Sequence, residues 1–444
     1  MESEDWTWPT VPLGSIAKFR AGSAFKTEHQ GGQTGEIPFI KVSDFSLPEN
    51  SFQIQGANNW VSRAKASEIK AALHPPGATV FAKIGVALTY NRRRLLVRDT
   101  AIDNNLMSAA PIAGKVSSQF LYCLLSHLDF NVIANGSALP YLNVSDLQKI
   151  EVGLPPREIQ GEIAGTLMTL QQRIDLLRQT NATLESIAQA LFKSWFIDFD
   201  PVRAKTEGRE PDGMDAAKAA LFPAEFEESE LGVIPKGWQA SAIRDVVEGI
   251  YDGPHATPPE ASAGPVFLGI KNLTGTSLDL SEIRHVDERD WARWTRRVTP
   301  TANDIVFSYE AALGLFALVP PHLRCCLGRR LALVRAKARD GTPHFWFHQF
   351  VSPTFQQLLA KHTVHGATVN RIALKEFPSY KVLNPPVLVR TAFEQAAAPL
   401  WARIHLNSQL VQVLSSVRDT LLPRLISGKL RMPEAEAQLE EAAE

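Results

Sequence analysis

The longest regular pattern of apolar positions in the chain runs from Pro156 to about Ile197. Apolar side chains recur there at alternating spacings of four and three residues, and Asn181 takes one of these positions. This is the a/d pattern of a coiled-coil seam, and it predicts one uninterrupted helix, roughly 60 Å long at about 1.5 Å per residue. The predicted seam contains Leu167, Leu170, Ile174, Leu177, Asn181, Leu184 and Leu191.

A second stretch, about 387–428, repeats the pattern and supplies a partner helix of similar length. It ends at Ser427-Gly428, where glycine suits the position after a helix C-terminus. We expect the two helices to pack antiparallel about a pseudo-two-fold axis, with Asn181 opposite Asn407 fixing the register and Leu170 opposite Arg418 as the one poor layer. The alternative is that the two asparagines face solvent or another protein. The second seam contains Leu400, Ile404, Asn407, Val411, Leu414 and Leu421.

An internal repeat explains why the chain has two such helices. Residues 136–156 read GSALPYLNVSDLQKIEVGLPP, and residues 366–386 read GATVNRIALKEFPSYKVLNPP. Both segments have the same length, begin with glycine and end with Pro-Pro, at an offset of 230 that continues into the helices. Weaker matches lie upstream, where PFIKVSDFS from Pro38 resembles VFLGIKNLT from Val266. Each half is therefore predicted to be a globular part followed by a long helix.

The globular parts are predicted to be α+β, with a twisted sheet or a small barrel, because short apolar runs alternate with turn residues. Expected strands include 79–83, 305–309 and 330–335, and expected helices include 118–128 and 345–359. The predicted organisation is a first globular part at 1–155, a helix at 156–199, a connector at 200–235, a second globular part at 236–385, a helix at 386–430 and an acidic tail at 431–444.

Charge is distributed unevenly along a chain whose net charge is only −1. Residues 236–385 carry 18 Lys and Arg against 13 Asp and Glu, whereas 198–235 carry 4 against 10 and 431–444 carry 1 against 5. The acidic segments therefore mask a more basic second globular part. The three cysteines do not suggest a disulfide framework, and neither a signal peptide nor a membrane span is expected, so we expect a cytoplasmic protein.

Motifs for catalysis are missing from the sequence. It has no dinucleotide fingerprint, phosphate loop, nucleophile elbow or zinc-protease motif. Asn384-Pro385-Pro386 is similar to an amino-methyltransferase motif but lacks its aromatic residue, so a strand-to-helix corner is favoured. His344 and His348 have the spacing of metal ligands, but aromatic packing or DNA-facing polar positions are favoured over a metal site.

Nucleic-acid binding has modest support from basic clusters that contain aromatic residues. YNRRR begins at Tyr90 and WARWTRR begins at Trp291. Arginine contacts phosphates, and arginine or asparagine reads base edges, although each cluster could equally be an ordinary solvated surface.

Several longer motifs make the chain resemble the specificity (S) subunit of type I restriction-modification systems. They are LFKSWFIDFDPVRAK from Leu191, LFP from Leu221, ELGVIPKGW from Glu230, DGPHATP from Asp252, IKN from Ile270 and LLPRLISGKL from Leu421. With the repeat, the resemblance covers essentially the whole chain. The first half departs from the Asp-Gly-x-His pattern, because it has Arg20-Ala21-Gly22-Ser23 instead.

This resemblance implies that each globular part is a target recognition domain for one half of a split, asymmetric DNA sequence. The paired helices would set the distance between the halves and dock two modification (methyltransferase) subunits, which restriction (motor-nuclease) subunits join. The chain itself would need no cofactor, because S-adenosylmethionine belongs to the modification subunit and ATP and magnesium to the restriction subunit. Alternatives are the recognition subunit of a methyltransferase without a nuclease, a stand-alone enzyme, and a coiled-coil scaffold without a role on DNA.

The residues expected to contact DNA combine the basic clusters with the Asp-Gly-x-His motif. They are Lys83, Tyr90, Asn91, Arg92 and Arg93 in the first globular part, and His255, Lys271, Arg296, Arg297, His365 and Arg371 in the second.

Overall fold

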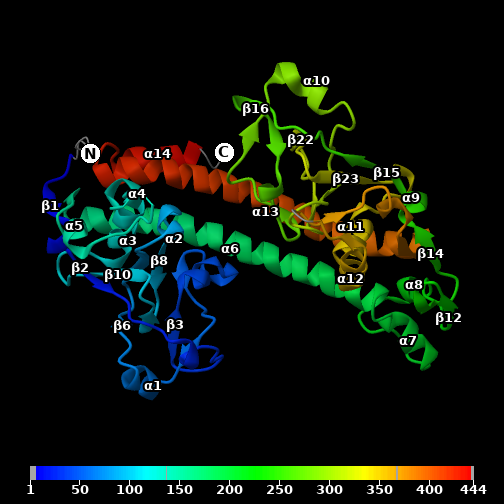
Figure 1. Cartoon of the computed structure of the whole chain (residues 1–444), viewed down its shortest axis with the longest axis horizontal. Coiled ribbons are helices and arrows are strands. Elements are labelled where there is room, and N and C mark those ends of the chain that lie inside the picture. The colour runs from blue at the N-terminus through cyan, green and yellow to red at the C-terminus, as the bar shows by residue number, and fades with distance from the viewer. Residues whose placement is uncertain (1–6, 137, 367–368, 442–444) are drawn as a thin grey trace. The chain divides into compact units, whose positions relative to one another are not determined.

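The computed structural model describes residues 7–136, 138–366 and 369–441. The chain divides into two compact units, of which unit 1 contains residues 1–179 and 409–444, and unit 2 contains residues 180–408. Figure 1 follows the chain from blue at the N-terminus to red at the C-terminus. The two longest helices, α6 (Arg157–Phe196) and α13 (Val387–Ser427), each contribute one segment to unit 1 and one to unit 2.

The globular part of unit 1 is built on two small sheets. The larger has the order β2-β10-β7-β8-β4 and the smaller has the order β5-β3-β9-β6, while β1 pairs with β11. The strands are β1 (Thr10–Pro12), β2 (Ala17–Ala21), β3 (Ile37–Ile40), β4 (Gln53–Ile54), β5 (Trp60–Val61), β6 (Leu73–His74), β7 (Thr79–Ala82), β8 (Arg93–Leu96), β9 (Thr100–Ile102), β10 (Leu106–Pro111) and β11 (Glu151–Gly153). The helices are α1 (Arg63–Glu68), α2 (Val86–Thr89), α3 (Ser118–His127), α4 (Phe130–Ile133) and α5 (Val144–Gln148).

The globular part of unit 2 has a closely similar plan. Its larger sheet has the order β15-β23-β20-β21, its smaller sheet has the order β19-β16-β22, and β14 pairs with β26. The strands are β14 (Gln239–Ala242), β15 (Val247–Asp252), β16 (Ala261–Leu268), β17 (Leu273–Thr274), β18 (Ser277–Leu278), β19 (Arg284–His285), β20 (Ile305–Ser308), β21 (Phe316–Leu318), β22 (Cys325–Leu327), β23 (Leu331–Ala336), β24 (Thr363–Val364), β25 (Arg371–Ile372) and β26 (Lys381–Asn384). The helices are α9 (Ile243–Val246), α10 (Trp291–Trp294), α11 (Pro343–Val351) and α12 (Pro353–Lys361).

The repeat predicted from the sequence is a repeat of strands. In the larger sheet of each unit, a central antiparallel pair, β10 with β7 in unit 1 and β23 with β20 in unit 2, lies between two further strands. In the smaller sheet of each unit, one pair is parallel, β3 with β9 in unit 1 and β16 with β22 in unit 2. At the helix-proximal end the offset is 230, because β11 and β26 begin at Glu151 and Lys381 and the long helices begin at Arg157 and Val387. The predicted α+β architecture of two similar globular parts, each followed by a long helix, is confirmed.

Apolar packing joins the long helices to the globular part within each unit. In unit 1, Ile163 and Leu167 of α6 share one core with Leu421 and Leu425 of α13. In unit 2, Phe192 of α6 belongs to a core with α13 residues that include Phe393, Ala397 and Trp401. In unit 1 the early part of α6 therefore packs with the late part of α13. In unit 2 the late part of α6 packs with the early part of α13, as in an antiparallel pair.

The polar seam positions lie in unit 2. The side-chain amide of Asn407 donates to Asn181 Oδ1 at 2.9 Å, and Asn181 Nδ2 donates to the Ile404 carbonyl oxygen at 3.2 Å and to Ser408 Oγ at 3.1 Å. This is the contact that the register argument places at these positions. In unit 1, Arg418, which the register argument pairs with Leu170, donates a hydrogen bond to Gln171 Oε1 and forms an ion pair with Asp419.

Three segments differ in detail from the sequence-based expectations. The helix expected at 345–359 is two helices, because Ser352 ends α11 and caps α12 at Pro353. The connector folds into α7 (Asp200–Thr206), α8 (Ala216–Ala219) and the hairpin β12 (Phe226–Ser229) with β13 (Gly232–Pro235). Part of the acidic tail forms α14 (Met432–Glu441), which lies beside the end of α13, where Arg424 Nη1 donates to Gln438 Oε1 at 3.2 Å (Figure 1). Within the described ranges, no helix combines the length and the apolar character needed to cross a membrane.

Candidate nucleic-acid interface

A tight glycine turn at the end of one strand opens the candidate site in both units. Gly253 N donates to the Leu331 carbonyl oxygen at 2.8 Å, and Gly22 N donates to the Leu106 carbonyl oxygen at 3.1 Å. A β-carbon on Gly253 would lie 2.4 Å from the Gly328 carbonyl oxygen, and one on Gly22 would lie 2.1 Å from the Asp103 carbonyl oxygen. Only glycine allows the backbones to approach this closely. The turn therefore persists in the first half although the residues around it differ.

In unit 2 three charged or titratable side chains meet at this turn, two from the turn itself and Arg297 from the segment after α10. Asp252 Oδ2 lies 3.1 Å from His255 Nε2 and 2.5 Å from Arg297 Nη1. Arg297 Nη1 also donates to the Gly253 carbonyl oxygen at 3.2 Å. The His255 side chain is 63% exposed, so the carboxylate holds two potential base-reading groups while leaving one of them open to a ligand.

A hairpin and the end of β20 extend this cluster. The backbone of Arg371 forms a β-bridge with Glu310, and Arg330 Nε lies 3.7 Å from Glu310 Oε2. The Tyr309 hydroxyl is buried without a partner among the described residues, and burial, with the nearby charges of Glu310 and Asp252, raises its pKa. His365, in the same hairpin, is exposed, and its Nδ1 lies 3.3 Å from Asn370 Oδ1. His255, Arg297, His365 and Arg371 thus belong to one region of unit 2.

The equivalent region of unit 1 has a different chemistry. Gly85 N donates to the Pro140 carbonyl oxygen at 2.8 Å, and Leu142 N donates to the Lys83 carbonyl oxygen at 2.9 Å, so the loop before α5 again lies against the end of the central strand. Three large apolar side chains are exposed here, with exposed fractions of 69% for Val86, 57% for Leu139 and 41% for Tyr141. Matching strand registers put Ala21 where unit 2 has Asp252. The first region therefore has exposed apolar side chains around Lys83, where the second has a cluster of charged ones.

The basic cluster from Tyr90 to Arg94 follows α2, and one of its arginines, Arg93, is buried. Arg93 is only 4% exposed, its Nη2 donates to the Leu128 carbonyl oxygen at 2.5 Å, and its guanidinium lies 3.9 Å from the centre of the Phe130 ring. Burial lowers the pKa of Arg93 to about 10. Arg93 is therefore largely enclosed in the protein, which disfavours base reading by this side chain, and its role on DNA stays a prediction.

The neighbours of Arg93 remain partly accessible. Tyr90 is 62% exposed, and the Arg92 guanidinium lies 4.9 Å from the centre of its ring. Asn91 adopts a left-handed backbone conformation with φ 56°, and its side chain joins Asp129 to the start of α4. Asn91 thus has a structural role in addition to any contact with DNA.

Two predicted residues of unit 2 lie outside the His255–Arg371 region. Lys271 Nζ lies 3.4 Å from Glu282 Oε2, and its side chain is 62% exposed. Arg296 is exposed just after α10. Lys271 bonds Glu282, and Arg296 directly precedes Arg297 of the Asp252 cluster, so contact with DNA by either residue stays a prediction. Sequence reasoning missed Asp252, Glu310 and Arg330 as members of the cluster, although the Asp-Gly-x-His motif contains the first.

The histidines with metal-ligand spacing are packing residues. His344 Nδ1 lies 2.5 Å from Glu394 Oε1, and His348 Nε2 accepts a hydrogen bond from Trp401 Nε1 at 3.1 Å. Burial, with a smaller effect from His344, lowers the pKa of His348 to about 3. Among the residues that the structure describes, no group of three or more His, Cys, Asp or Glu side chains is arranged to hold a metal ion.

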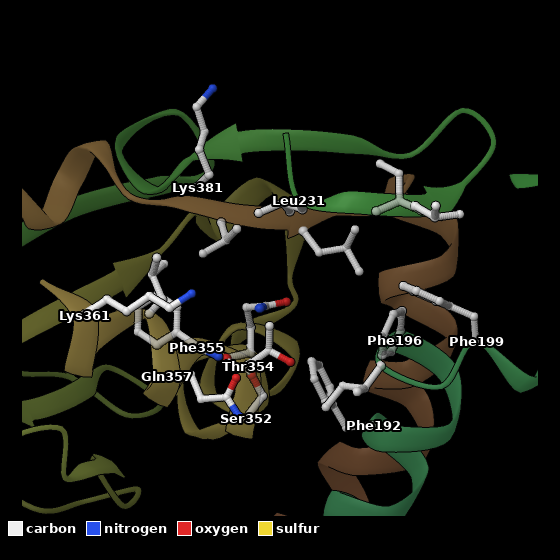
Figure 2. Close-up of a pocket in the computed structure, with 17 residues that line it drawn as sticks. Phe192, Phe196, Phe199, Leu231, Ser352, Thr354, Phe355, Gln357, Lys361 and Lys381 are labelled. Carbon is white, nitrogen blue, oxygen red and sulfur yellow. Dashed lines mark hydrogen bonds between the residues drawn. The ribbon is translucent and has the colours of Figure 1, made fainter. Parts of the chain in front are cut away.

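Unit 2 also contains an apolar pocket of about 320 Å³ beside the end of α6. Figure 2 shows Phe192, Phe196 and Phe199 on one side of it, and the N-cap residue Ser352 with Thr354 and Phe355 of α12 on the other. None of the predicted DNA-contacting residues lines this pocket. Its lining belongs mainly to the aromatic core that fixes the second globular part to the helices.

Comparisons with known proteins agree with this organisation. Residues 4–186 match the family model described as the type I restriction modification DNA specificity domain. The chain is 24% identical over 442 residues to the type I restriction enzyme MjaIX specificity subunit of Methanocaldococcus jannaschii, covering 96% of this chain and 94% of that protein. It is 25% identical over 396 residues to the HindI specificity subunit of Haemophilus influenzae, covering 76% of this chain and 84% of that protein.

A solved structure is similar in fold. The S subunit of a type I restriction-modification system from M. genitalium superposes with a TM-score of 0.55 at 13% identity, covering 96% of this chain and 98% of that one. Residues 4–186 therefore match a type I restriction modification DNA specificity domain, and the chain is similar over most of its length to type I restriction enzyme specificity subunits.

Proposed function

We propose that this chain reads a bipartite, asymmetric DNA target, with one target recognition domain in residues 1–155 and the other in residues 236–385. The observation that carries the proposal is the contrast between two equivalent regions on one repeated fold. Asp252, His255 and Arg371 mark the region in unit 2, whereas Leu139 and Tyr141 mark it in unit 1. Arginine suits guanine and apolar groups suit the thymine methyl, so the two half-sites differ in sequence.

The chain acts in this proposal as a recognition and assembly subunit and performs no chemistry itself. Two modification subunits and the restriction subunits join it, and they carry S-adenosylmethionine, ATP and magnesium. Docking surfaces are available on the outer faces of the helices, because Leu176 of α6 and Leu406 of α13 are both 54% exposed. These leucines are related by the repeat offset of 230, which suits two copies of one partner.

Mapping methylated sites in cells that carry the complete system tests the reading of DNA. Arg371→Ala should relax or change one position of the half-site read by the second domain and leave the other half-site unchanged. Arg289→Ala is the matched control, because this arginine of the same unit is 88% exposed and bonds its own neighbour Asp287. A changed first half-site, or an unchanged target in every variant of the Asp252 cluster, would contradict the assignment.

The role of the helices as a ruler has its own test. One additional heptad in each helix preserves the seam pattern and adds about 10 Å at about 1.5 Å per residue. We expect the unread spacer in the methylated sequence to lengthen by about three base pairs at about 3.4 Å each. A heptad in only one helix displaces the Asn181–Asn407 contact and is the control for mismatched register. An unchanged spacer in the double insertion would refute the ruler.

A further inference from the structure

A cavity of about 300 Å³ lies in unit 1, where β8 and α3 meet α6 and α13. Three carboxylates stand near it. Asp419 Oδ1 lies 2.7 Å from Arg418 Nη2, Asp175 accepts a hydrogen bond from the Ser51 hydroxyl, and Asp129 accepts one from Asn91 Nδ2. The cavity wall is nevertheless rich in basic side chains, since five arginines line it: Arg92, Arg93, Arg94, Arg178 and Arg418.

Neutral partners hold the two most enclosed of these arginines. Arg93 donates to the carbonyl oxygens of Asn91 and Leu128, and Arg94 donates to the carbonyl oxygens of Arg93 at 2.8 Å and Phe45 at 3.1 Å. Carbonyl groups orient a guanidinium but do not neutralise it. Burial accordingly lowers the pKa of both arginines. A buried charge is costly. Asp129 and Asp175 offset part of this cost by their nearby charges, but they bond Asn91 and Ser51. An anion in the cavity would reduce the cost further.

One polar atom in the cavity wall lacks a partner among the described residues. It is Arg93 Nε, on a side chain that is more than nine-tenths buried. Ser126, which also lines the cavity, has a side-chain hydrogen bond with Tyr122. Buried donors normally find an acceptor, so an unpaired guanidinium nitrogen beside a basic cavity indicates a missing acceptor.

The equivalent junction in unit 2 shows that the fold does not require this chemistry. Strand registers match Arg93 with Phe316, and the offset of α3 from α11 matches Ser126 with Val351. The helix offset of 230 matches Arg418 with Ala188, which is fully buried. Unit 2 builds the junction from an apolar aromatic core, whereas unit 1 lines it with arginines. The basic cavity is therefore a property of this sequence at this place.

We propose that this cavity in unit 1 binds a phosphate-type oxyanion, supplied either by a free phosphate or by a DNA phosphodiester. The guanidinium fork matches such oxygens geometrically, and a charge-assisted hydrogen bond from a hydroxyl such as Ser126 Oγ adds to the fit. The proposal gives Arg92 and Arg93 an anion-binding role in place of base reading. It does not depend on which DNA sequence the chain recognises.

Calorimetric titration of the full-length chain with inorganic phosphate, at constant ionic strength maintained with chloride, tests the site. We expect saturable binding to one site. Arg418→Ala, which reproduces the residue of unit 2, should weaken it about tenfold or more, the effect of losing one charge-assisted hydrogen bond. Ser126→Val, which also reproduces unit 2, should weaken it without changing the charge. Arg289→Ala should bind phosphate like the wild type.

A mixed-sequence DNA duplex distinguishes the two sources of phosphate. If a DNA phosphodiester occupies the cavity, the duplex suppresses phosphate binding, and Arg418→Ala lowers the salt dependence of DNA binding by about one ion. If a free anion occupies it, phosphate binds equally with and without the duplex. Both results support the site. Absence of saturable phosphate binding in the wild type, or equal phosphate affinity in the wild type, Arg418→Ala and Ser126→Val, would overturn it.

Discussion

The Asn181–Asn407 contact predicts an asymmetry between two alanine substitutions. Asn407 is 1% exposed, and its amide donates to Asn181 Oδ1 at 2.9 Å. Asn181 is half-buried and donates in addition to Ile404 and Ser408. Asn181→Ala therefore leaves a buried amide without this acceptor, whereas Asn407→Ala leaves a side chain that keeps its other two hydrogen bonds.

An unsatisfied buried polar group costs about 1–3 kcal/mol, whereas a hydrogen bond that is exchanged for water costs about 0.5–1.5 kcal/mol. We expect Asn181→Ala to lower the free energy of unfolding by about 2 kcal/mol and Asn407→Ala by about 1 kcal/mol. The double substitution removes both the donor and the acceptor. It should therefore cost less than the sum of the two single changes, with a coupling of about 1 kcal/mol.

Urea denaturation of the four proteins, followed by circular dichroism, measures this cycle. Ser186→Ala on the same helix is the control, because its hydroxyl is exposed and bonds only within the helix, to the Ala182 carbonyl oxygen. We expect that change to stay within about 0.5 kcal/mol of the wild type. Additive costs for Asn181→Ala and Asn407→Ala would refute the argument, because they would mean that the two side chains do not act as a pair.

Further predictions concern the glycine turn, the buried histidines and the charge of the isolated chain. Gly253→Ala places a β-carbon 2.4 Å from a carbonyl oxygen, so methylation mapping should show a loss of target recognition, whereas Gly269→Ala, whose nearest neighbour would lie at 3.7 Å, should be tolerated. Burial lowers the pKa of His405 to about 4 and that of His348 to about 3, both below the unfolded value of about 6.5. The unfolded state therefore binds more protons as the pH falls from about 6.5 to 4, and stability falls with it. His405→Leu should make this slope shallower by up to about 1.4 kcal/mol per pH unit in urea denaturation at pH 7 and pH 5, and an unchanged slope would contradict the reasoning. The isolated chain, with a net charge of −1, should bind DNA with a shallow salt dependence, and a steep slope in titrations at several salt concentrations would argue against phosphate contacts from other subunits.

The long helices were the most predictable part of the fold because their signals are local. A seam spacing and a Pro-Pro stop placed them at 156–197 and 387–428, and the structure has them at Arg157–Phe196 and Val387–Ser427. The strands expected at 79–83 and 305–309 also agree closely with β7 and β20, because short β-branched runs between turns are local signals too. The single helix predicted at 345–359 was wrong in detail, because Ser352 and Pro353 divide the segment into two helices.

Residue-by-residue matching of the two halves could not be extended upstream from the helices by sequence alone. The offset is 230 at β11 and β26 but 225 at β10 and β23, since the loops between the strands differ in length. The strand registers remove this ambiguity, and they match Ala21 with Asp252 and Arg93 with Phe316. Equivalent positions of the candidate interface are thus defined by hydrogen bonding and not by sequence similarity.

Charge in the sequence was also a poor guide to exposure. Tyr90 to Arg94 read as one basic cluster, yet Tyr90 is 62% exposed while Arg93 is 4% exposed. Tyr90 lies at the end of α2, before β8, whereas Arg93 begins β8, where carbonyl oxygens and the Phe130 ring provide a site that accepts a guanidinium inside the protein. The same local sequence therefore contributes to an open surface and to an enclosed one. A substitution at Arg93 would then test the integrity of unit 1, and substitutions at exposed positions such as His255 would test DNA reading, so the two kinds of residue belong in separate experiments.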